Sequence, residues 1–199
     1  MDNKLVQIDA NIIKVVIFGP ESTGKTTISR QLARYYNTVW VPEYAREYLQ
    51  DKWNNHRETC TNDDLIPIAV GQMKLENELA KKADKLLICD TDLLETKVYS
   101  QEYYGGFVDE RLNEAANTNQ YDLYFLTYID TPWEADDLRD RPDQRQEMFD
   151  AFENALKSHH KNYILLKGDK KTRLATAVKA IDELLKKHLD LDRFLGKKA

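Results

Sequence analysis

The chain has little cysteine, and none of its apolar runs approaches the length of a membrane span. Its two cysteines, Cys60 and Cys89, lack the spacing of a metal-binding pair. Cys89 lies within an apolar stretch, where a buried thiol usually acts as a small hydrophobic side chain. Residues 1–11 are too polar for a signal peptide. These absences argue against a membrane protein, and we expect a protein of the reducing cytoplasm.

Internal repeats and low-complexity linkers are also missing, and neither sign of charge dominates. The chain has 29 Lys and Arg against 34 Asp and Glu, and its net charge of −5 argues against a dedicated nucleic-acid-binding protein. Its 199 residues, 42% of them hydrophobic, are enough to bury a substantial core. We expect a single domain over residues 1–199, flexible at 1–11 and 192–199; the sequence gives no indication of oligomeric state.

One motif stands out from this ordinary composition: residues 19–26 read Gly-Pro-Glu-Ser-Thr-Gly-Lys-Thr, which matches G-x-x-x-x-G-K-[ST]. It follows the apolar run 12–18, expected as a buried parallel strand, and precedes a helix-like stretch at 26–36. Backbone N–H groups of such a loop and the helix N-terminus bind phosphates. We expect Lys25 to reach the β- and γ-phosphates and Thr26 to ligate Mg²⁺. The predicted site for ATP comprises Gly19, Glu21, Ser22, Thr23, Gly24, Lys25, Thr26 and Thr27.

Strand-like and helix-like segments alternate along the chain, which predicts an α/β fold with a parallel sheet covered on both faces. The expected strands are residues 12–18, 38–41, 85–89, 123–129 and 163–166. Ligands gather beyond the carboxyl ends of the strands in such sheets, so the residues that follow each strand are the candidates for function.

An acid, Glu43, follows the second expected strand. It can face an acceptor hydroxyl and take its proton during phosphoryl transfer, or it can be a helix-start acid of no catalytic importance. Arg46 lies on the same helical face and can hold a phosphate or the substrate. Its alternative role is an ion pair with Glu43 or Glu47.

Two acids, Asp90 and Asp92, follow the third expected strand. A carboxylate in this place, beside the phosphate loop, commonly holds the Mg²⁺ shell, and Asp90 is our candidate for that role. Asp92 is a candidate substrate contact, but its position also suits a helix cap, which is the interpretation we favour.

The stretch 130–145 carries three arginines among several aspartates beyond the fourth strand. Such a loop can fold over a triphosphate as a lid, neutralise transition-state charge and exclude water. The alternative is a solvated loop whose arginines pair with its own aspartates. We favour the lid, with Arg139 and Arg145 as its catalytic residues; Arg141 precedes a proline and is the weaker candidate.

Aromatic residues gather near the predicted acceptor side, and most of them are expected to pack in the core. One or two can stack on a planar ring, and a cationic ring would gain from cation–π attraction. Tyr44 and Trp133 are the candidates for this contact.

Several motifs together resemble the ribosylnicotinamide kinase domain of the NadR family of NAD-biosynthesis proteins. They are the phosphate loop, Glu-Tyr-Ala-Arg-Glu-Tyr at 43–48, Asp-Thr-Asp at 90–92, and Asp-Asp-Leu-Arg at 136–139 followed by Arg-Gln at 145–146. The phosphate loop alone is generic, whereas the combination of the second and third motifs is much more specific. The resemblance extends over residues 13–187.

The resemblance implies a P-loop NTPase fold: a three-layer sandwich in which a five-stranded parallel sheet of order 2-3-1-4-5 is flanked by helices, with an arginine lid. It implies ATP-dependent phosphorylation of nicotinamide riboside at its 5′-hydroxyl, giving nicotinamide mononucleotide. Glu43 would match the family's acid after the second strand, and Asp90 and Asp92 its paired acids. Full-length members carry an adenylyltransferase domain before the kinase, whereas only residues 1–11 precede the first strand here. We therefore expect a free-standing kinase or a relative with another acceptor.

Three functions follow from these patterns. The leading one is a small-molecule kinase, a phosphotransferase with an alcohol acceptor, acting on nicotinamide riboside. The second is a kinase for another nucleoside or small alcohol. The third is a regulatory switch that binds ATP, hydrolyses it slowly and signals to a partner protein, and the compact length of the chain argues against it.

Overall fold

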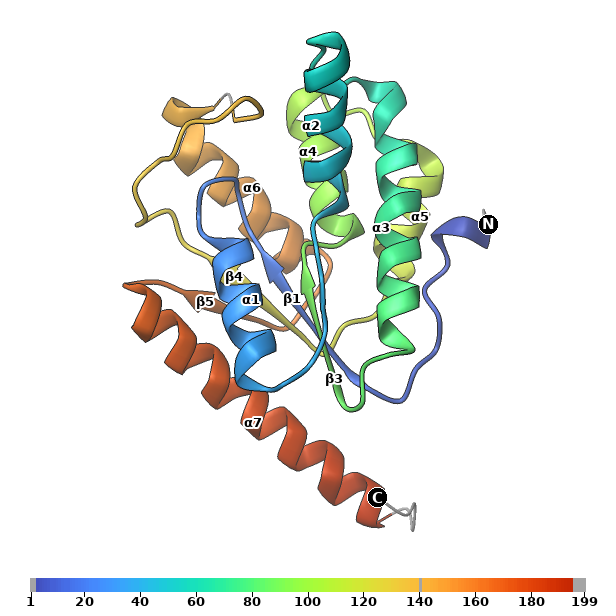
Figure 1. The fold of residues 1–199 in the computed structure, drawn as a ribbon, viewed down its shortest axis with the longest axis vertical. Coiled ribbons are helices and arrows are strands. Elements are labelled where there is room, and N and C mark those ends of the chain that lie inside the picture. The colour runs from blue at the N-terminus through green and yellow to red at the C-terminus, as the bar shows by residue number, and fades with distance from the viewer. Residues whose placement is uncertain (1–2, 140, 195–199) are drawn as a thin grey trace.

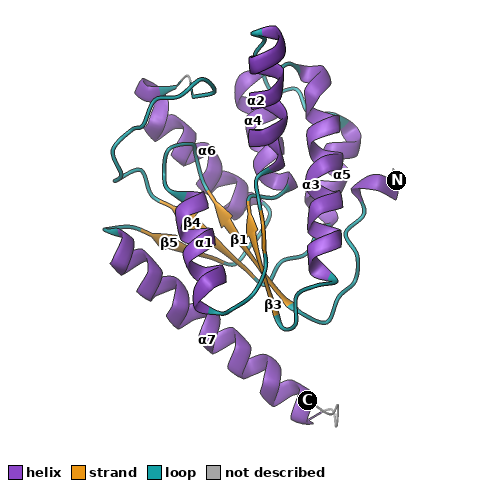
Figure 2. Ribbon diagram, in the orientation of Figure 1, coloured by secondary structure: helices purple, strands orange, loops and turns teal. Residues whose placement is uncertain are grey.

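The fold is a parallel sheet with helices on both faces, seen in a computed structural model that describes residues 3–139 and 141–194 (Figure 1 and Figure 2). The strands are β1 (Ile13–Phe18), β2 (Trp40–Val41), β3 (Leu86–Asp90), β4 (Leu123–Thr127) and β5 (Tyr163–Leu166). They form a 5-stranded sheet of order β2-β3-β1-β4-β5, in which all pairs are parallel. The predicted fold class and strand order are confirmed.

The central strand, β1, is buried along its whole length. An unbroken apolar strand is stable here because helices cover the sheet on both sides. β1 pairs with β3 and β4, and the register places Ile17 opposite Asp90. The carboxylate at the end of β3 therefore lies beside the point where β1 enters the phosphate loop.

Alternate residues of β1 face two different helical layers. Val15 packs with α1 (Lys25–Tyr35) and α7 (Lys170–Phe194). Val16 belongs to the core on the other face, where the covering helices are α3 (Leu65–Ala80), α4 (Leu93–Tyr103), α5 (Glu110–Thr118) and α6 (Arg145–Ser158). On α6 the residues at helical spacing that face this core are buried: Met148, Phe149, Phe152 and Leu156.

The helix α2 (Tyr44–His56) has none of its residues buried. It lies alongside α3 above the sheet (Figure 1). An element with so little buried surface depends on few packing contacts. The structure therefore places the segment that follows Glu43 on the least buried of the helices that surround the phosphate loop.

The described part of the N-terminal segment packs on the body of the protein. A short 3-10 helix, η1, spans Asn3–Leu5, and the Leu5 side chain is buried. Gln7 Nε2 donates a hydrogen bond to Glu76 Oε1 at 2.7 Å. The expected flexibility of residues 1–11 stays a prediction. At the other end α7 continues to Phe194, and residues 195–199 lie outside the described part, as do residues 1–2.

Within the described residues, no helix combines the length and the apolar character that a membrane crossing requires. Both cysteines are free thiols, and Cys89 is fully buried in β3, as its apolar surroundings predict. Burial raises the pKa of the Cys89 thiol well above its usual value, so it acts as a small hydrophobic side chain.

Candidate active site

The phosphate loop, residues 19–26, joins β1 to α1 and rests against the end of β4. Gly19 has a φ of +139°, and a Cβ atom there would lie 2.5 Å from Thr127 Oγ1, so only glycine fits. Thr23 Oγ1 donates to the Pro20 carbonyl at 2.7 Å and lies 2.7 Å from the same Thr127 hydroxyl. Gly24, at φ +86°, turns the chain into α1. These contacts fix the backbone whose N–H groups are expected to bind phosphate.

Lys25, the first residue of α1, is only 7% exposed and is held by protein oxygens. Its Nζ donates to the carbonyls of Gly19 at 2.6 Å and Pro20 at 3.1 Å, and lies 3.2 Å from Glu95 Oε1. Burial lowers the pKa of Lys25, but the charges of Glu95, Glu43 and Asp90 outweigh burial and raise it. Lys25 is therefore a permanent cation in a site rich in carboxylates.

Asp90 ends β3 beside the loop and is 0% exposed. Neither of its buried oxygens has a hydrogen-bond partner of good geometry among the described residues. Burial and the nearby charge of Glu43 raise the pKa of Asp90 to about 7, against the opposing effects of Thr26 and Lys25.

A buried carboxylate without donors, close to a threonine hydroxyl, fits the shell of a Mg²⁺ ion. The described part of the chain has no group of three or more His, Cys, Asp or Glu side chains that could hold a metal. Thr26 and Asp90 can therefore hold the ion only with further oxygens from phosphates and water, as hard cations in phosphate sites commonly require.

Glu43 links β2 to α2 and stands at the N-cap of that helix, although its side chain makes no capping hydrogen bond. Its charge acts on Lys25, Asp90 and Glu95, raising the pKa of all three. The structure thus brings Glu43, Lys25 and Asp90 together at the carboxyl ends of β2, β1 and β3. Their catalytic roles stay predictions.

The structure assigns Asp92 to a helix cap. Asp92 Oδ1 accepts the Glu95 backbone N–H at 3.0 Å, and Oδ2 accepts the Tyr124 hydroxyl at 2.7 Å. The side chain is buried, and both of its oxygens are occupied by protein donors. The predicted substrate contact therefore gives way to the capping alternative.

Tyr44 also differs from the expectation. A Cβ atom on Gly71 of α3 would lie 2.1 Å from the Tyr44 ring, so the ring rests on the backbone of α3. It faces the junction of α2 and α3, where Tyr48 is its aromatic neighbour at 6.2 Å between ring centroids. The predicted stacking of Tyr44 on a substrate stays a prediction.

The predicted lid, residues 130–145, is tied to the phosphate loop, and Asp140 within it lies outside the described residues. Arg145, the first residue of α6, donates to the Thr131 carbonyl at 2.8 Å and to the Ser22 carbonyl at 3.4 Å. Thr131 Oγ1 donates to the Ser22 carbonyl at 2.8 Å, and Ser22 Oγ accepts the Glu134 N–H at 2.8 Å. The segment therefore lies against the loop that it was expected to cover.

Another lid contact reaches α2. Asp136 accepts a hydrogen bond from Arg46 at 2.7 Å and pairs with Arg139 at 3.1 Å. The Arg139 pairing matches the solvated alternative that we weighed for this loop. Arg46 pairs with Asp136 instead of Glu43 or Glu47, because the lid brings its acid to α2 across the site.

A narrow pocket lies between the phosphate loop, α4 and the lid. The Arg141 guanidinium lies 3.7 Å from the centre of the Tyr103 ring, and that of Arg145 lies 5.7 Å from the Trp133 ring. The pocket is lined by Pro20, Glu21, Tyr99, Tyr103, Trp133, Arg141, Arg145 and Met148.

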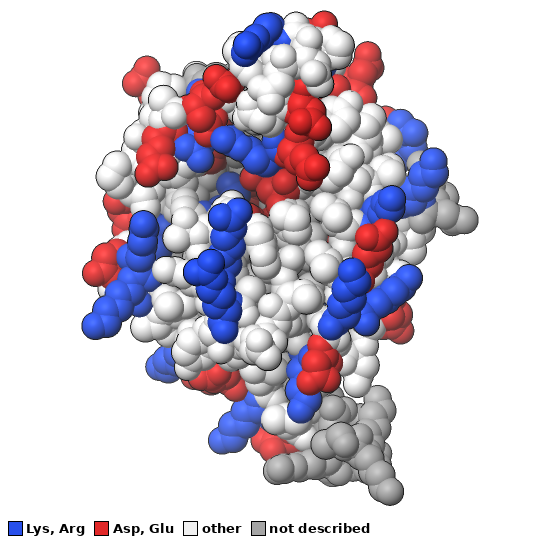
Figure 3. All heavy atoms as spheres, viewed as in Figure 1, with Lys and Arg blue, Asp and Glu red and all other residues white. Residues whose placement is uncertain are grey.

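On the face shown in Figure 3, charged side chains of both signs crowd around a hollow beside α2.

Sequence reasoning missed Glu95 and Arg173. Glu95 stands three residues after Asp92, a spacing that marks the first turn of a capped helix and gives no sign of contact with Lys25. Buried Arg173 donates to the Thr23 carbonyl at 2.7 Å and to the Tyr128 carbonyl at 2.9 Å, and it pairs with Asp130. It therefore joins the phosphate loop to the end of β4. Its position in the sequence indicated only the start of the last helix.

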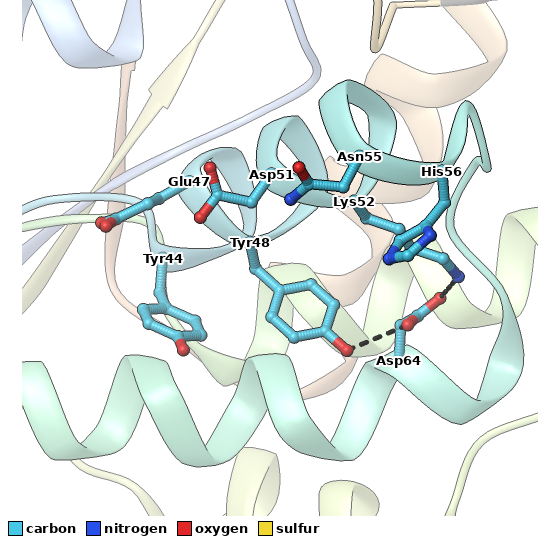
Figure 4. A pocket seen from close by; sticks show the side chains of 8 residues that line it. All are labelled: Tyr44, Glu47, Tyr48, Asp51, Lys52, Asn55, His56 and Asp64. Carbon is cyan, nitrogen blue, oxygen red and sulfur yellow. Dashed lines mark hydrogen bonds and ion pairs between the residues drawn. The ribbon is translucent and has the colours of Figure 1, made fainter.

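A separate groove of about 450 Å³ runs along α2 beside α3 (Figure 4). Asp64 accepts hydrogen bonds from Tyr48 at 3.0 Å and Lys52 at 2.7 Å across one end of the groove. Its lining residues are Tyr44, Glu47, Tyr48, Asp51, Lys52, Asn55, His56 and Asp64. None of them belongs to the phosphate loop or the lid, so this groove is distinct from the phosphate site.

Comparison with known proteins agrees with this geometry. A family model described as an AAA domain matches residues 14–173. The trifunctional NAD biosynthesis/regulator protein NadR of Salmonella typhimurium is 33% identical over 128 residues, which cover 63% of this chain and 30% of that protein. The chain thus spans less than a third of this relative's length. The resemblance to NadR that the motifs predict is confirmed.

Two solved structures share the fold. A NadR protein in complex with NR matches 86% of this chain and 51% of its own, with a TM-score of 0.73 and 24% identity. A thymidylate kinase from Ehrlichia chaffeensis matches 85% of this chain and 98% of its own, with a TM-score of 0.62 and 17% identity. At these identities the likeness concerns the fold, which is that of P-loop kinases.

Proposed function

We propose that this chain, which belongs to the AAA domain family, is an ATP-dependent kinase that phosphorylates nicotinamide riboside at the 5′-hydroxyl, giving nicotinamide mononucleotide. The observation that carries the proposal is the meeting of Lys25, Glu43 and Asp90 at three adjacent strand ends. A phosphate-binding cation, an acid for the metal shell and an acid on the acceptor side are the parts that phosphoryl transfer to an alcohol requires. The NadR relative supports the choice of acceptor.

ATP binds with its phosphates in the loop. The backbone N–H groups of residues 19–26 and the N-terminus of α1 surround the β- and γ-phosphates, and Lys25 contacts them as a point charge. Thr26 and Asp90 would hold Mg²⁺, which would neutralise charge on the phosphate oxygens. Arg173 keeps the loop in register with β4 through the Thr23 carbonyl.

Glu43 faces the acceptor side. Its carboxylate accepts the proton of the attacking hydroxyl, or anchors that hydroxyl in line with the γ-phosphate. The side chain is available for this because it makes no capping hydrogen bond to α2. The Arg46 guanidinium donates a hydrogen bond to the Asp136 carboxylate at 2.7 Å and so helps to hold the lid against this side of the site.

The acceptor's pyridinium ring is a planar cation, and the pocket beside the lid offers aromatic faces to it. Trp133 and Tyr103 now lie near the guanidinium groups of Arg145 and Arg141. A ring that already attracts one cation can attract another, so a bound pyridinium would exchange with an arginine. Arg145 can then contact the transferring phosphate once it also leaves the Thr131 and Ser22 carbonyls, and Arg139 can do so once it leaves Asp136.

The test is acceptor-stimulated ADP release in the presence of ATP and Mg²⁺. Nicotinamide riboside is compared with ordinary nucleosides, and Lys25→Ala provides the blank. Strong stimulation by nicotinamide riboside alone supports the proposal. Stimulation by another nucleoside retains the kinase and replaces its acceptor. Slow, Lys25-dependent hydrolysis without any acceptor effect would indicate a regulatory ATPase.

A further inference from the structure

Glu95 is a buried acid that the proposed reaction does not use. Glu95 stands in the first turn of α4 and is 2% exposed. Its Oε1 atom lies 3.2 Å from Lys25 Nζ. Neither carboxylate oxygen has a hydrogen-bond partner of good geometry among the described residues. Buried carboxylates normally have several donors, so this one is stabilised mainly by the charge of Lys25.

The backbone of Glu95 is held in place by the helix cap of α4. Its backbone N–H is bonded to the capping carboxylate of Asp92, which the buried Tyr124 hydroxyl holds in turn. The start of α4 is therefore anchored in the core, and the Glu95 side chain points from a rigid base toward the phosphate loop.

Lys25 is surrounded by oxygens in this arrangement. Its Nζ donates hydrogen bonds to the Gly19 and Pro20 carbonyls and forms an ion pair with the Glu95 carboxylate at 3.2 Å. A phosphate that approaches Lys25 must displace at least one of them. The carbonyls are part of the loop that surrounds the phosphate, whereas Glu95 is an anion that phosphate repels. Glu95 is therefore the partner that gives way.

We infer that Glu95 is a positioning residue that holds Lys25 in the nucleotide-free site and competes with the β- and γ-phosphates for it. Its effect passes through Lys25 and requires no contact with the reacting atoms. Glu43 and Asp90 act on Lys25 only through their charge, since no ion pair joins either of them to Lys25 within the described residues. The inference rests on the proposed nucleotide site but not on the proposed acceptor.

Competition of this kind has a specific consequence. Nucleotides that carry β- or γ-phosphates must take Lys25 from Glu95, so Glu95 weakens their binding. AMP has no phosphate at those positions, so its binding does not depend on Glu95. The residue thus makes the site respond to the phosphate that Lys25 contacts rather than to the nucleoside.

The experiment measures the Kd of ADP and of AMP with Mg²⁺, without any acceptor, for the wild type, Glu95→Gln and Glu102→Gln. The control removes an exposed charge from the same helix, α4. Calorimetry at about pH 9.5 keeps Glu95 largely ionised, because burial raises its pKa to about 8. We expect Glu95→Gln to bind ADP about tenfold more tightly, the scale of one charged hydrogen bond, with AMP changed by less than about twofold and Glu102→Gln unchanged.

Unchanged or weaker ADP binding by Glu95→Gln would overturn the inference, as would an equal gain for AMP. Glu95→Asp provides a second variant should Glu95→Gln fold poorly: its shorter side chain draws the charge away from Lys25, so it should give an intermediate gain. Failure of nicotinamide riboside as acceptor leaves these results untouched. If the wild type did not bind ADP, the proposed nucleotide site would be wrong, and the inference that rests on it would be overturned.

Discussion

Among the residues that the structure describes, two lysine–glutamate pairs are buried, one at each end of β1, and they differ in how fully the surrounding residues satisfy them. At the start of the strand, Glu76 Oε1 accepts hydrogen bonds from Gln7 at 2.7 Å and Lys14 at 3.5 Å. Glu76 Oε2 accepts the Tyr121 hydroxyl at 2.7 Å, and Lys14 Nζ also bonds to the Ile8 carbonyl at 3.3 Å. This pair ties the N-terminal segment to the core.

At the other end of β1 the buried carboxylates lack such donors among the described residues. Glu95 and Asp90 are buried without hydrogen-bond partners of good geometry in the described structure, although Lys25 lies close by. Leaving buried acceptors unsatisfied costs stability, and proteins accept that cost mainly where a ligand completes the set. Both pairs are buried. What separates the structural pair from the functional one is whether hydrogen-bond donors satisfy the carboxylate.

Lys25→Ala should have the largest effect. Loss of the cation that contacts the β- and γ-phosphates is expected to lower ATP turnover by at least about a thousandfold. The measurement is ADP release per folded protein, with thermal unfolding as the check on folding. Lys14→Ala is the matched control at the other end of β1 and should retain turnover; a comparable loss in both variants would contradict the comparison.

Glu76→Ala should instead lower stability. It leaves Lys14 as a buried charge without its carboxylate, and removing one partner of a buried pair typically costs about 3–5 kcal/mol. Urea unfolding measures the loss, and Glu78→Ala, on the exposed side of α3, should change stability by less than about 0.5 kcal/mol. ADP affinity of the folded protein should stay the same, since Glu76 lies at the end of β1 remote from the loop.

Glu43→Gln sharpens the comparison within the functional cluster. An amide cannot take the acceptor's proton, so turnover should fall by about a hundredfold while ATP affinity is retained. Steady-state kinetics with a binding assay separates the two quantities. The exposed Glu47 provides the control, and Glu47→Gln should behave as wild type. Unaltered turnover in Glu43→Gln would remove this residue from the mechanism.

The smallest expected effect concerns pH. Burial, with the charges of Glu43 and Asp90, raises the pKa of Glu95 from 4.5 to about 8 despite the opposing charge of Lys25. The folded chain holds this proton more tightly than the unfolded chain does, so the contribution of Glu95 to stability falls as pH rises from about 4.5 to about 8. Glu95→Gln cannot ionise and should lose less stability over that range in urea unfolding; an equal loss would show that Glu95 does not titrate there.

The elements that the sequence predicts correctly depend on local patterns. The apolar run of β1 and the phosphate loop each occupy one short window, and the parallel sheet places Glu43 and Asp90 near Lys25 because strand ends meet at one edge. Spacing alone therefore identifies the phosphate side of the site.

The residues that the sequence misplaces depend on contacts between distant segments. Tyr44 turns to α3 because Gly71, far along the chain, leaves room for its ring. Arg46 pairs with Asp136 on the lid, and Lys25 pairs with Glu95 on α4. Local spacing offers Arg46 several partners, so tertiary packing decides which contact forms.

The absence of buried residues on α2 has an evolutionary consequence. Five of its residues are exposed: Glu47, Asp51, Asn54, Asn55 and His56. Substitutions at such positions usually change stability by less than about 0.5 kcal/mol, whereas those in a packed site such as Gly19 or Thr23 cost far more. The helix that begins after Glu43 can therefore diversify under weak constraint while the phosphate loop stays fixed. A scaffold built in this way can acquire new acceptors by drift along a single helix and still retain its phosphate chemistry.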